Sequence, residues 1–523
     1  MSGDDVFRKL ISGSRFNYKK FGSDVKKFSI NKSHDDQSCV QSGDDIPPVD
    51  ETIGGQTHNG SDKPKKKSSA PKSRKQLIEL NTERVNQLRN KYRIHVKGSD
   101  VNEPIVSFDE LNVDQNIMEN IRKSGFGSPT AVQMQSIPLL MSKREMLCCA
   151  PTGSGKTLAF LIPIVHQLRG PQRKGFRAVI LAPTRELAKQ IHRECLWISN
   201  GTGLRVHIIK NVNLAQKKFG PNSELMYDIL VTTPNRLVYL LSQEPVAINI
   251  ENVEWLVIDE CDKLFEEGFR DQLSVIFQSC GKSTKVSHAM FSATHDIELE
   301  KWAKLNLDNL VAVGIGGKNN ASQEVDQTLT FVGNESGKIM ALRDVIARGC
   351  EAPVLIFVDK IQKAKQLHKE LVYDGINIDV IHSKRTQQDR DNVVRSFREG
   401  KVWFLICTDL MGRGIDFKGV NLVINYDFPS TSVSYIHKIG RTGRAGRKGK
   451  AITFFTEKDS DKLRSIANVM RRSGCDVPQF MLELNKRKRK FFNNKRKQNN
   501  KSKDKKSKKL KADESDDNDI ESD

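Results

Sequence analysis

A glycine-rich loop at positions 150–157 has the spacing of a phosphate-binding loop. It follows the apolar segment Met146–Cys149 and precedes the apolar segment Leu158–Leu168. In such a strand–loop–helix context, backbone amides surround phosphate oxygens and the helix N-terminus adds the positive end of its dipole. We predict that a nucleotide binds to Ala150, Pro151, Thr152, Gly153, Ser154, Gly155, Lys156 and Thr157. Lys156 would reach the β- and γ-phosphates and Thr157 would place its hydroxyl on Mg²⁺, whereas the alternative is a glycine-rich turn without a ligand.

An acidic cluster follows a second apolar segment, Trp255–Ile258. Ligands of open α/β sheets bind at the carboxyl ends of the strands, which is where this cluster would lie. Asp259 is expected to hold Mg²⁺, directly or through water, and Glu260 to orient and polarise the attacking water. A surface cluster of acids is the alternative, but the position after a phosphate-binding loop favours ATP hydrolysis.

Short apolar strands alternate with longer amphipathic segments in two stretches of the chain, which predicts parallel sheets covered by helices. We expect strands at Met146–Cys149, Ala178–Ala182, Ile229–Val231, Leu256–Ile258, Ala289–Phe291, Val354–Val358, Val380–Ile381, Phe404–Cys407, Leu422–Ile424 and Ile452–Phe455. The protein is therefore predicted to be of the α/β class, with two parallel-sheet domains at 106–318 and 324–484. A linker is expected near 316–323 and a helical flank at 76–105.

The composition predicts a nucleic-acid partner and unfolded ends. The 523 residues carry a formal net charge of +21, which favours binding to polyanions, although basic tails without such a ligand are the alternative. Residues 1–75 and 485–523 are polar and are expected to be disordered. The lysine-rich segment 63–75 resembles a nuclear-localisation signal, or else it only keeps a linker solvated. The basic segment 486–511 could hold RNA, address the nucleus, or both.

The cysteines and the hydropathy of the chain argue against several classes of protein. None of the nine cysteines forms a C-x-x-C pair, so we expect a reducing compartment, no disulfide framework and no zinc site. No run of about 18 apolar residues is present, so no membrane span is expected. The first residues are too polar for a secretory signal.

The acidic cluster at 259–262 resembles the box that names the DEAD-box RNA helicases, with Cys261 in place of alanine. This resemblance implies two tandem RecA-like domains that bind ATP, Mg²⁺ and RNA. Gly125, Phe126, Pro129, Thr130 and Gln133 are similar to the Q motif of the family, and Phe108 stands at the expected distance upstream. By resemblance, Gln133 pairs with the adenine edge and Phe108 stacks on the base, with core packing as the alternative for Phe108.

Three further segments of the first domain resemble family motifs. The segments 183–188 and 233–236 are similar to those that hold the RNA backbone, with Asn235 where the family has glycine. They imply RNA contacts by Pro183, Thr184, Arg185, Thr233, Pro234 and Arg236. Ser292 and Thr294 belong to a Ser-Ala-Thr segment similar to the one that links hydrolysis to strand separation. The Gly-Gly motif of the family has no clear counterpart in 210–220.

The second domain completes the resemblance. The segment 408–416 is similar to motif V, which implies that Thr408 contacts RNA and that Gly414 and Asp416 bind the nucleotide. The segment 437–444 is similar to motif VI, with Lys438 where the family usually has arginine. Its residues Arg441 and Arg444 are the candidate arginine fingers. His437 is expected to link the box at 259–262 to the second domain rather than to perform acid–base chemistry, and Asp262 is counted among the coupling residues. Leu355–Val358 and the pair Gln387 and Arg390 resemble the remaining motifs. ATP and RNA would then bind cooperatively, because each needs both domains.

The flanking segments indicate a branch of the family. Phe7–Leu10, Asn90–Lys97, Lys217–Pro221 and Gly268–Leu273 resemble the Rok-type branch, which processes pre-ribosomal RNA for the small subunit in the nucleolus. This implies pre-rRNA, pre-ribosomal proteins or a helicase activator as partners, and a location in the nucleus. The Cys form of the box also occurs in a splicing and mRNA-export branch, which remains an alternative. A DNA helicase and a nucleotide-gated RNA clamp that does not unwind are further alternatives.

Overall fold

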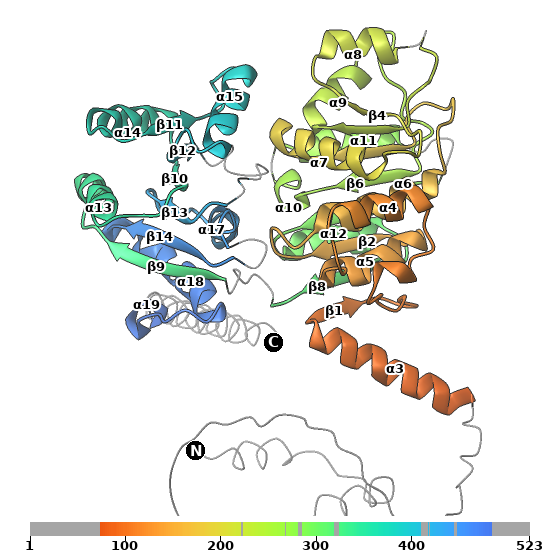
Figure 1. The fold of residues 1–523 in the computed structure, drawn as a ribbon, viewed down its shortest axis with the longest axis horizontal. Helices are drawn as coiled ribbons and strands as arrows, with labels where there is room; N and C mark the ends of the chain where they lie inside the picture. The colour runs from red at the N-terminus through yellow and green to blue at the C-terminus, as the bar shows by residue number, and fades with distance from the viewer. Residues whose placement is uncertain are drawn as a thin grey trace, which may run out of the picture. The chain divides into compact units, whose positions relative to one another are not determined.

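The computed structural model describes residues 74–220, 223–266, 268–280, 285–317, 324–408, 417, 419–443 and 447–483 (Figure 1). Of the two segments predicted to be disordered, 1–75 and 485–523, only Arg74 and Lys75 belong to this part of the chain. The segment Phe7–Leu10, the lysine-rich cluster before Arg74 and most of the expected linker are outside it as well.

The first domain contains an eight-stranded sheet with the order β1-β8-β2-β7-β6-β3-β5-β4. Its strands are β1 (Ile94–Lys97), β2 (Met146–Cys149), β3 (Ala178–Leu181), β4 (Val206–Ile208), β5 (Ile229–Thr232), β6 (Trp255–Ile258), β7 (Ser287–Ser292) and β8 (Val311–Ile315). All neighbouring pairs are parallel except β1 and β8, where Ile94 faces Ile315 in antiparallel register. The parallel sheet brings the carboxyl ends of β2 and β6 to the same edge.

Helices cover both faces of this sheet. The covering elements are η1 (Phe108–Glu110), α4 (Gln115–Lys123), α5 (Ala131–Met141), α6 (Lys156–Leu168), α7 (Arg185–Ile198), α8 (Val212–Phe219), α9 (Pro234–Leu241), α10 (Cys261–Leu264), α11 (Arg270–Ser279) and α12 (Ile297–Asn306). In β3, Ala178 and Ile180 pack into the core with α4 to α7, whereas Val179 and Leu181 pack into the core with α8 to α12. Burial on both faces explains why these strands are continuous apolar runs.

The expected helical flank at 76–105 is only partly helical. Helix α3 spans Arg74–Lys91 and is followed by the edge strand β1. Strand β1 pairs with β8, more than two hundred positions further along the chain, so that local patterns could not reveal it. The two elements thus extend the first domain at one edge of its sheet.

The second domain contains a six-stranded, all-parallel sheet with the order β11-β12-β10-β13-β14-β9. Its elements are β9 (Val325–Phe331), α13 (Glu335–Ala347), β10 (Val354–Val358), α14 (Ile361–Tyr373), β11 (Ile378–Ile381), α15 (Gln387–Arg398), β12 (Phe404–Thr408), β13 (Leu422–Asn425), α17 (Ser432–Ile439), β14 (Gly449–Phe455), η2 (Glu457–Asp459), α18 (Ser460–Arg472) and α19 (Gln479–Glu483). Two apolar cores again lie on its two faces. The prediction of an α/β protein with two tandem parallel-sheet domains is confirmed.

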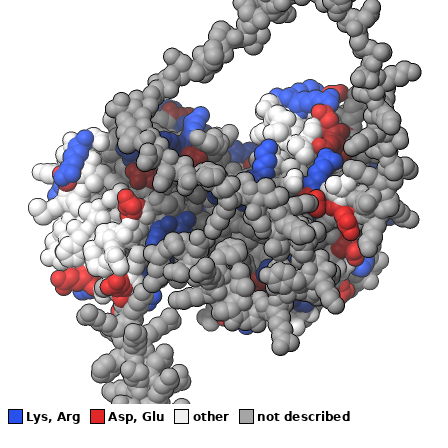
Figure 2. Space-filling view, turned by 90° about the horizontal axis from the view of Figure 1, so that it is seen from below, with Lys and Arg blue, Asp and Glu red and all other residues white. Residues whose placement is uncertain are grey.

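Charged side chains of both signs are interspersed over the described surface in the view of Figure 2. The described side chains in this view therefore do not form one continuous basic patch. Among the described residues, no helix is long and apolar enough to cross a membrane.

Candidate nucleotide and RNA sites

A cavity of about 890 Å³ lies at the carboxyl ends of β2 and β6. Its walls include Thr152, Gly153, Gly155, Lys156 and Thr157 of the phosphate-binding loop, the acidic residues Asp259 and Glu260, and Gln133 of the Q motif. The second domain contributes Arg441 and its neighbours to the same cavity. Half of the residues predicted to bind ATP therefore line one cavity. Ala150, Pro151 and Ser154 of the loop are not among its lining residues, and Gly414, Asp416 and Arg444 lie outside the described residues.

The loop after β2 has the backbone geometry of a phosphate cradle. Gly153 and Gly155 have φ angles of 78° and 93°, which favour glycine, and α6 begins directly afterwards at Lys156. The Lys156 ammonium donates hydrogen bonds to the carbonyl oxygens of Ala150 at 2.7 Å and Pro151 at 3.2 Å. A Cβ atom at Gly155 would lie only 2.6 Å from Nε2 of Gln133, so a larger residue there would displace the Gln133 amide.

Gln133 connects the Q motif to this loop. Its Oε1 accepts a hydrogen bond from the Thr130 backbone amide at 3.0 Å, and its Nε2 donates to the Gly155 carbonyl at 3.1 Å. A primary amide has one further N–H and one further lone pair, so the group still has the capacity to pair with an adenine edge.

Three aromatic residues line the cavity, Phe126, Trp197 and Phe417, and the expected Phe108 is not among them. Phe108 is 5% exposed and packs into the core of the first domain, and it is not among the residues that line the cavity. This position corrects the expectation that Phe108 stacks on the base, because its ring is enclosed by apolar side chains. Phe126 lines the cavity instead and is 48% exposed. Phe126 belongs to the Q motif and was therefore visible in the sequence, but spacing alone could not show which of the two phenylalanines reaches the cavity.

Asp259 and Glu260 line the cavity and are both buried. Burial raises the pKa of Asp259 to about 7, and the positive charge of Lys156 partly opposes this shift. A buried carboxylate of this kind suits a cation, and Thr157 lines the same cavity with its hydroxyl group. The described residues contain no cluster of three or more His, Cys, Asp or Glu that could hold a metal. Two protein oxygens fit Mg²⁺, which usually keeps several water or phosphate ligands.

Glu260 faces the other domain. Its φ angle of 49° is unusual for a residue with a side chain. Glu260 is the N-cap residue of α10. The Glu260 Oε1 atom lies 3.8 Å from Nη2 of Arg441, whose side chain is almost fully buried. Arg441 is held by a hydrogen bond from its Nε to the His437 carbonyl oxygen at 3.2 Å. The predicted catalytic carboxylate and one candidate arginine finger thus meet across the two domains.

The residues expected to couple the domains form one buried network. The Asp262 Oδ2 atom accepts a hydrogen bond from the Thr294 hydroxyl at 2.9 Å and lies 2.6 Å from Nε2 of His437. Ser292 fixes Thr294, because its hydroxyl donates to the Thr294 carbonyl at 2.6 Å and accepts from the Thr294 amide at 3.0 Å. A further contact between the domains joins the Thr152 hydroxyl to the Gly440 carbonyl at 3.1 Å.

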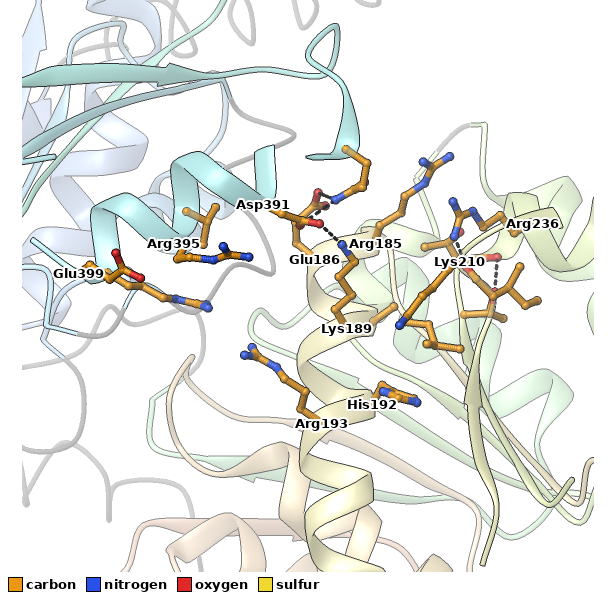
Figure 3. Close-up of a pocket in the computed structure, with 18 residues that line it drawn as sticks. Arg185, Glu186, Lys189, His192, Arg193, Lys210, Arg236, Asp391, Arg395 and Glu399 are labelled. Carbon is orange, nitrogen blue, oxygen red and sulfur yellow. Dashed lines mark hydrogen bonds and ion pairs between the residues drawn. The ribbon is translucent and has the colours of Figure 1, made fainter. Parts of the chain in front are cut away.

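A second cavity, of about 730 Å³, contains part of the predicted RNA contacts (Figure 3). Arg185, Thr233 and Arg236 line it, and the N-termini of α7 and α9 lie beside it, where Thr184, Thr233 and Pro234 begin the helices. Burial lowers the pKa of Arg236 to about 10, and the charge of Arg185 adds to this effect. Pro183 and Thr408 are not among its lining residues.

Side chains of α7 and α15 point toward one another across this cavity (Figure 3). Glu186 forms an ion pair with Arg390 at 3.1 Å and accepts a hydrogen bond from Gln387 at 3.0 Å. Lys189 forms an ion pair with Asp391. Further basic residues that the sequence analysis did not single out line the cavity, namely His192, Arg193, Lys210, Arg395 and Arg398. Their types are favourable for phosphate, but only the fold shows that they converge.

Helix α7 forms a wall shared by the two cavities. Leu187, Gln190, Glu194 and Trp197 line the nucleotide cavity, whereas Arg185, Glu186, Ala188, Lys189, His192 and Arg193 line the second one. These two sets occupy different faces of the helix, as its period of 3.6 residues requires.

Comparisons with known proteins give a consistent result for both domains. Residues 130–302 match the family described as "DEAD/DEAH box helicase", and residues 337–446 match the "Helicase conserved C-terminal domain". The chain is 48% identical to the probable ATP-dependent RNA helicase DDX52 of Mus musculus, over 94% of this chain and 93% of that one. It is 42% identical to the ATP-dependent RNA helicase ROK1 of Saccharomyces cerevisiae, over 83% and 78% of the two chains.

The fold is also similar to that of solved helicases. A structure of S. cerevisiae Dbp5 bound to RNA and ADP BeF3 superimposes with a TM-score of 0.62 at 28% identity. This match covers 71% of the present chain and 94% of the other.

Proposed function

The chain belongs to the DEAD/DEAH box helicase family, and from this premise we propose how its two cavities work together in an ATP-dependent RNA helicase. ATP binds in the larger cavity, with its phosphates in the loop around Lys156 and its adenine beside Gln133 and Phe126. Mg²⁺, held by Thr157 and Asp259, would neutralise phosphate charge when bound. Glu260 accepts the proton of the attacking water, and Arg441 stabilises charge that develops on the γ-phosphate.

RNA binds in the second cavity, where hydroxyl groups, helix N-termini and arginines contact its backbone. Such contacts position a strand without reading its base sequence, so the target must be selected by other parts of the protein or by partners. ATP binding and RNA binding support each other, because both need the arrangement in which Asp262 contacts His437. The Dbp5 structure that resembles this fold was solved with both RNA and a nucleotide, which supports the proposal.

We further propose that the chain acts on pre-rRNA during maturation of the small ribosomal subunit, in the nucleus and nucleolus. Support comes from the identity to ROK1 and DDX52 and from the resemblance of the flanking segments to the Rok-type branch. Pre-ribosomal proteins or an activator would then be its partners. A clamp that holds RNA without unwinding it is compatible with the same two cavities.

The observation that carries the mechanism is the approach of Arg441 to Glu260 from the opposite domain, at 3.8 Å. We expect single-stranded RNA to stimulate ATP hydrolysis by the purified full chain, and single-stranded DNA to stimulate it far less. Glu260→Gln should lower kcat by about 10²–10⁴-fold and leave ATP affinity nearly unchanged, because it removes general-base catalysis and not a binding contact. Equal stimulation by DNA, or normal turnover in Glu260→Gln, would contradict the proposal.

Displacement of a labelled strand from an RNA duplex separates an unwinding enzyme from a clamp. An unwinding enzyme releases the strand only with ATP, whereas a clamp shows ATP-dependent retention of single-stranded RNA without release.

A further inference from the structure

One face of α7 lines the nucleotide cavity with residues that belong to none of the motifs described above. Gln190, Glu194 and Trp197 are spaced by four and three positions, which places them on the same side of the helix. The Gln190 amide donates a hydrogen bond to the Glu194 carboxylate at 3.0 Å. This row ends at Trp197, beside the Q-motif residues that form the base end of the cavity.

Trp197 makes an aromatic contact with Phe126. The centroids of the two rings are 6.1 Å apart and their planes are inclined by 72°, which is an edge-to-face arrangement. This geometry is favourable because the positive edge of one ring meets the negative face of the other. Trp197 itself packs against the core of the first domain, so it offers Phe126 an anchored partner.

Phe126 has little other support from its own loop. It lies between Gly125, which has a φ angle of 73°, and Gly127. A Cβ atom added at either glycine would meet nothing within 4 Å, so this part of the loop is not packed against other elements. Because the Phe126 side chain is also 48% exposed, the contact with Trp197 is important for the direction of its ring.

We propose that Trp197 is a positioning residue for the nucleotide base. Its indole holds the Phe126 ring in place at the cavity, so that the adenine of ATP stacks on that ring while Gln133 pairs with the adenine edge. The inference rests on the proposed binding of ATP in this cavity. It assigns the base end of the cavity to two elements, the Q-motif loop and α7.

The test compares Trp197→Ala with Trp197→Phe in the full chain. Trp197→Ala should raise the Kd and KM for ATP about 2- to 12-fold, the range expected for loss of an aromatic pair, and leave kcat within about twofold. Trp197→Phe should restore most of the affinity. The affinity for inorganic tripolyphosphate, measured by competition, should be the same in all three proteins because it has no base. An unchanged Kd for ATP in Trp197→Ala, or an equal loss of tripolyphosphate binding, would overturn the proposal.

Tryptophan fluorescence provides a second measurement. The chain has four tryptophans, and Trp197 is the one that lines the nucleotide cavity. ATP should therefore change the emission of the unmodified chain and of the control Trp302→Phe, whereas Trp197→Phe should lose the change and still bind ATP in calorimetry. A change that persists in Trp197→Phe would overturn the proposal. Failure of the unmodified chain to bind ATP would instead refute the proposed function, so the two failures are distinguishable.

Discussion

The contact between His437 and Asp262 makes the coupling of the two domains accessible to experiment. Both side chains are almost fully buried, and the Nε2 atom of His437 lies 2.6 Å from the Asp262 carboxylate. His437→Ala removes this hydrogen bond without touching the phosphate-binding loop or the RNA-side residues. We expect ATP and RNA each to bind nearly normally alone, and the mutual enhancement of their binding to fall.

The size of this effect follows from the kind of bond. A hydrogen bond to a charged group contributes about 1.5–3 kcal/mol. Since about 1.4 kcal/mol corresponds to a factor of ten, the enhancement should fall by about 10- to 150-fold. The bond from Thr294 to the same Asp262 oxygen remains in the variant, so the carboxylate keeps one partner and the effect should not greatly exceed this range.

The assay measures the Kd of single-stranded RNA by fluorescence anisotropy, with and without a non-hydrolysable ATP analogue. The ratio of the two values gives the coupling, and the same factor must appear in the effect of RNA on the analogue. Thr294→Val removes the other bond to Asp262, within the first domain, and is compared with His437→Ala to separate the bond between the domains from a general disturbance of the Asp262 carboxylate. A ratio unchanged in His437→Ala would refute the reasoning that this contact carries the coupling.

Two further predictions concern catalysis and stability. Arg441→Ala should lower RNA-stimulated kcat by about 10³–10⁵-fold, and a loss confined to KM would contradict its role at the γ-phosphate. Asp228→Asn should lower the free energy of unfolding at pH 7 by about 3–5 kcal/mol in urea titrations, because it leaves the buried Arg177 without its ion-pair partner. Burial alone would raise the pKa of Asp228, but hydrogen bonds from Arg205 and Arg177 hold it below its ordinary value of 3.8. The stabilisation is therefore complete above that pH and is lost as the pH falls through the lower pKa of the folded state. In a plot of the free energy of unfolding against pH, Asp228→Asn should therefore flatten the decrease at acid pH. The exposed control Asp344→Asn should change this curve little.

Structure and chemistry are most predictable from the sequence where one local pattern determines both. The segments around β2 and β6 are short, continuous apolar runs, and their polar successors must emerge at the carboxyl edge of a parallel sheet. For this reason the positions of Lys156, Asp259 and Glu260 relative to the sheet could be predicted without coordinates. The roles of these residues in catalysis remain proposals.

Features that depend on distant pairing were not predictable in the same way. Strand β1 is a strand because Ile94–Lys97 pairs with β8, and no local pattern contains that partner. Phe108 and Phe126 are both aromatic residues near the Q motif, yet one is enclosed by the core and the other reaches the cavity. The convergence of basic residues from α7 and α15 likewise depends on how the domains meet, not on spacing within either helix.

Helix α7 presents one face to each cavity, so a change in its length would disturb both sites. Each residue of an α-helix turns the following side chains by about 100°, so a single insertion near Ala188 would rotate everything beyond it. Gln190, Glu194 and Trp197 would then leave the nucleotide cavity, and His192 and Arg193 would leave the second cavity at the same time. A substitution can alter one site while sparing the other, but a single-residue insertion or deletion near Ala188 changes both. The rotation of α7 about its axis therefore fixes which of its side chains enter each of the two cavities.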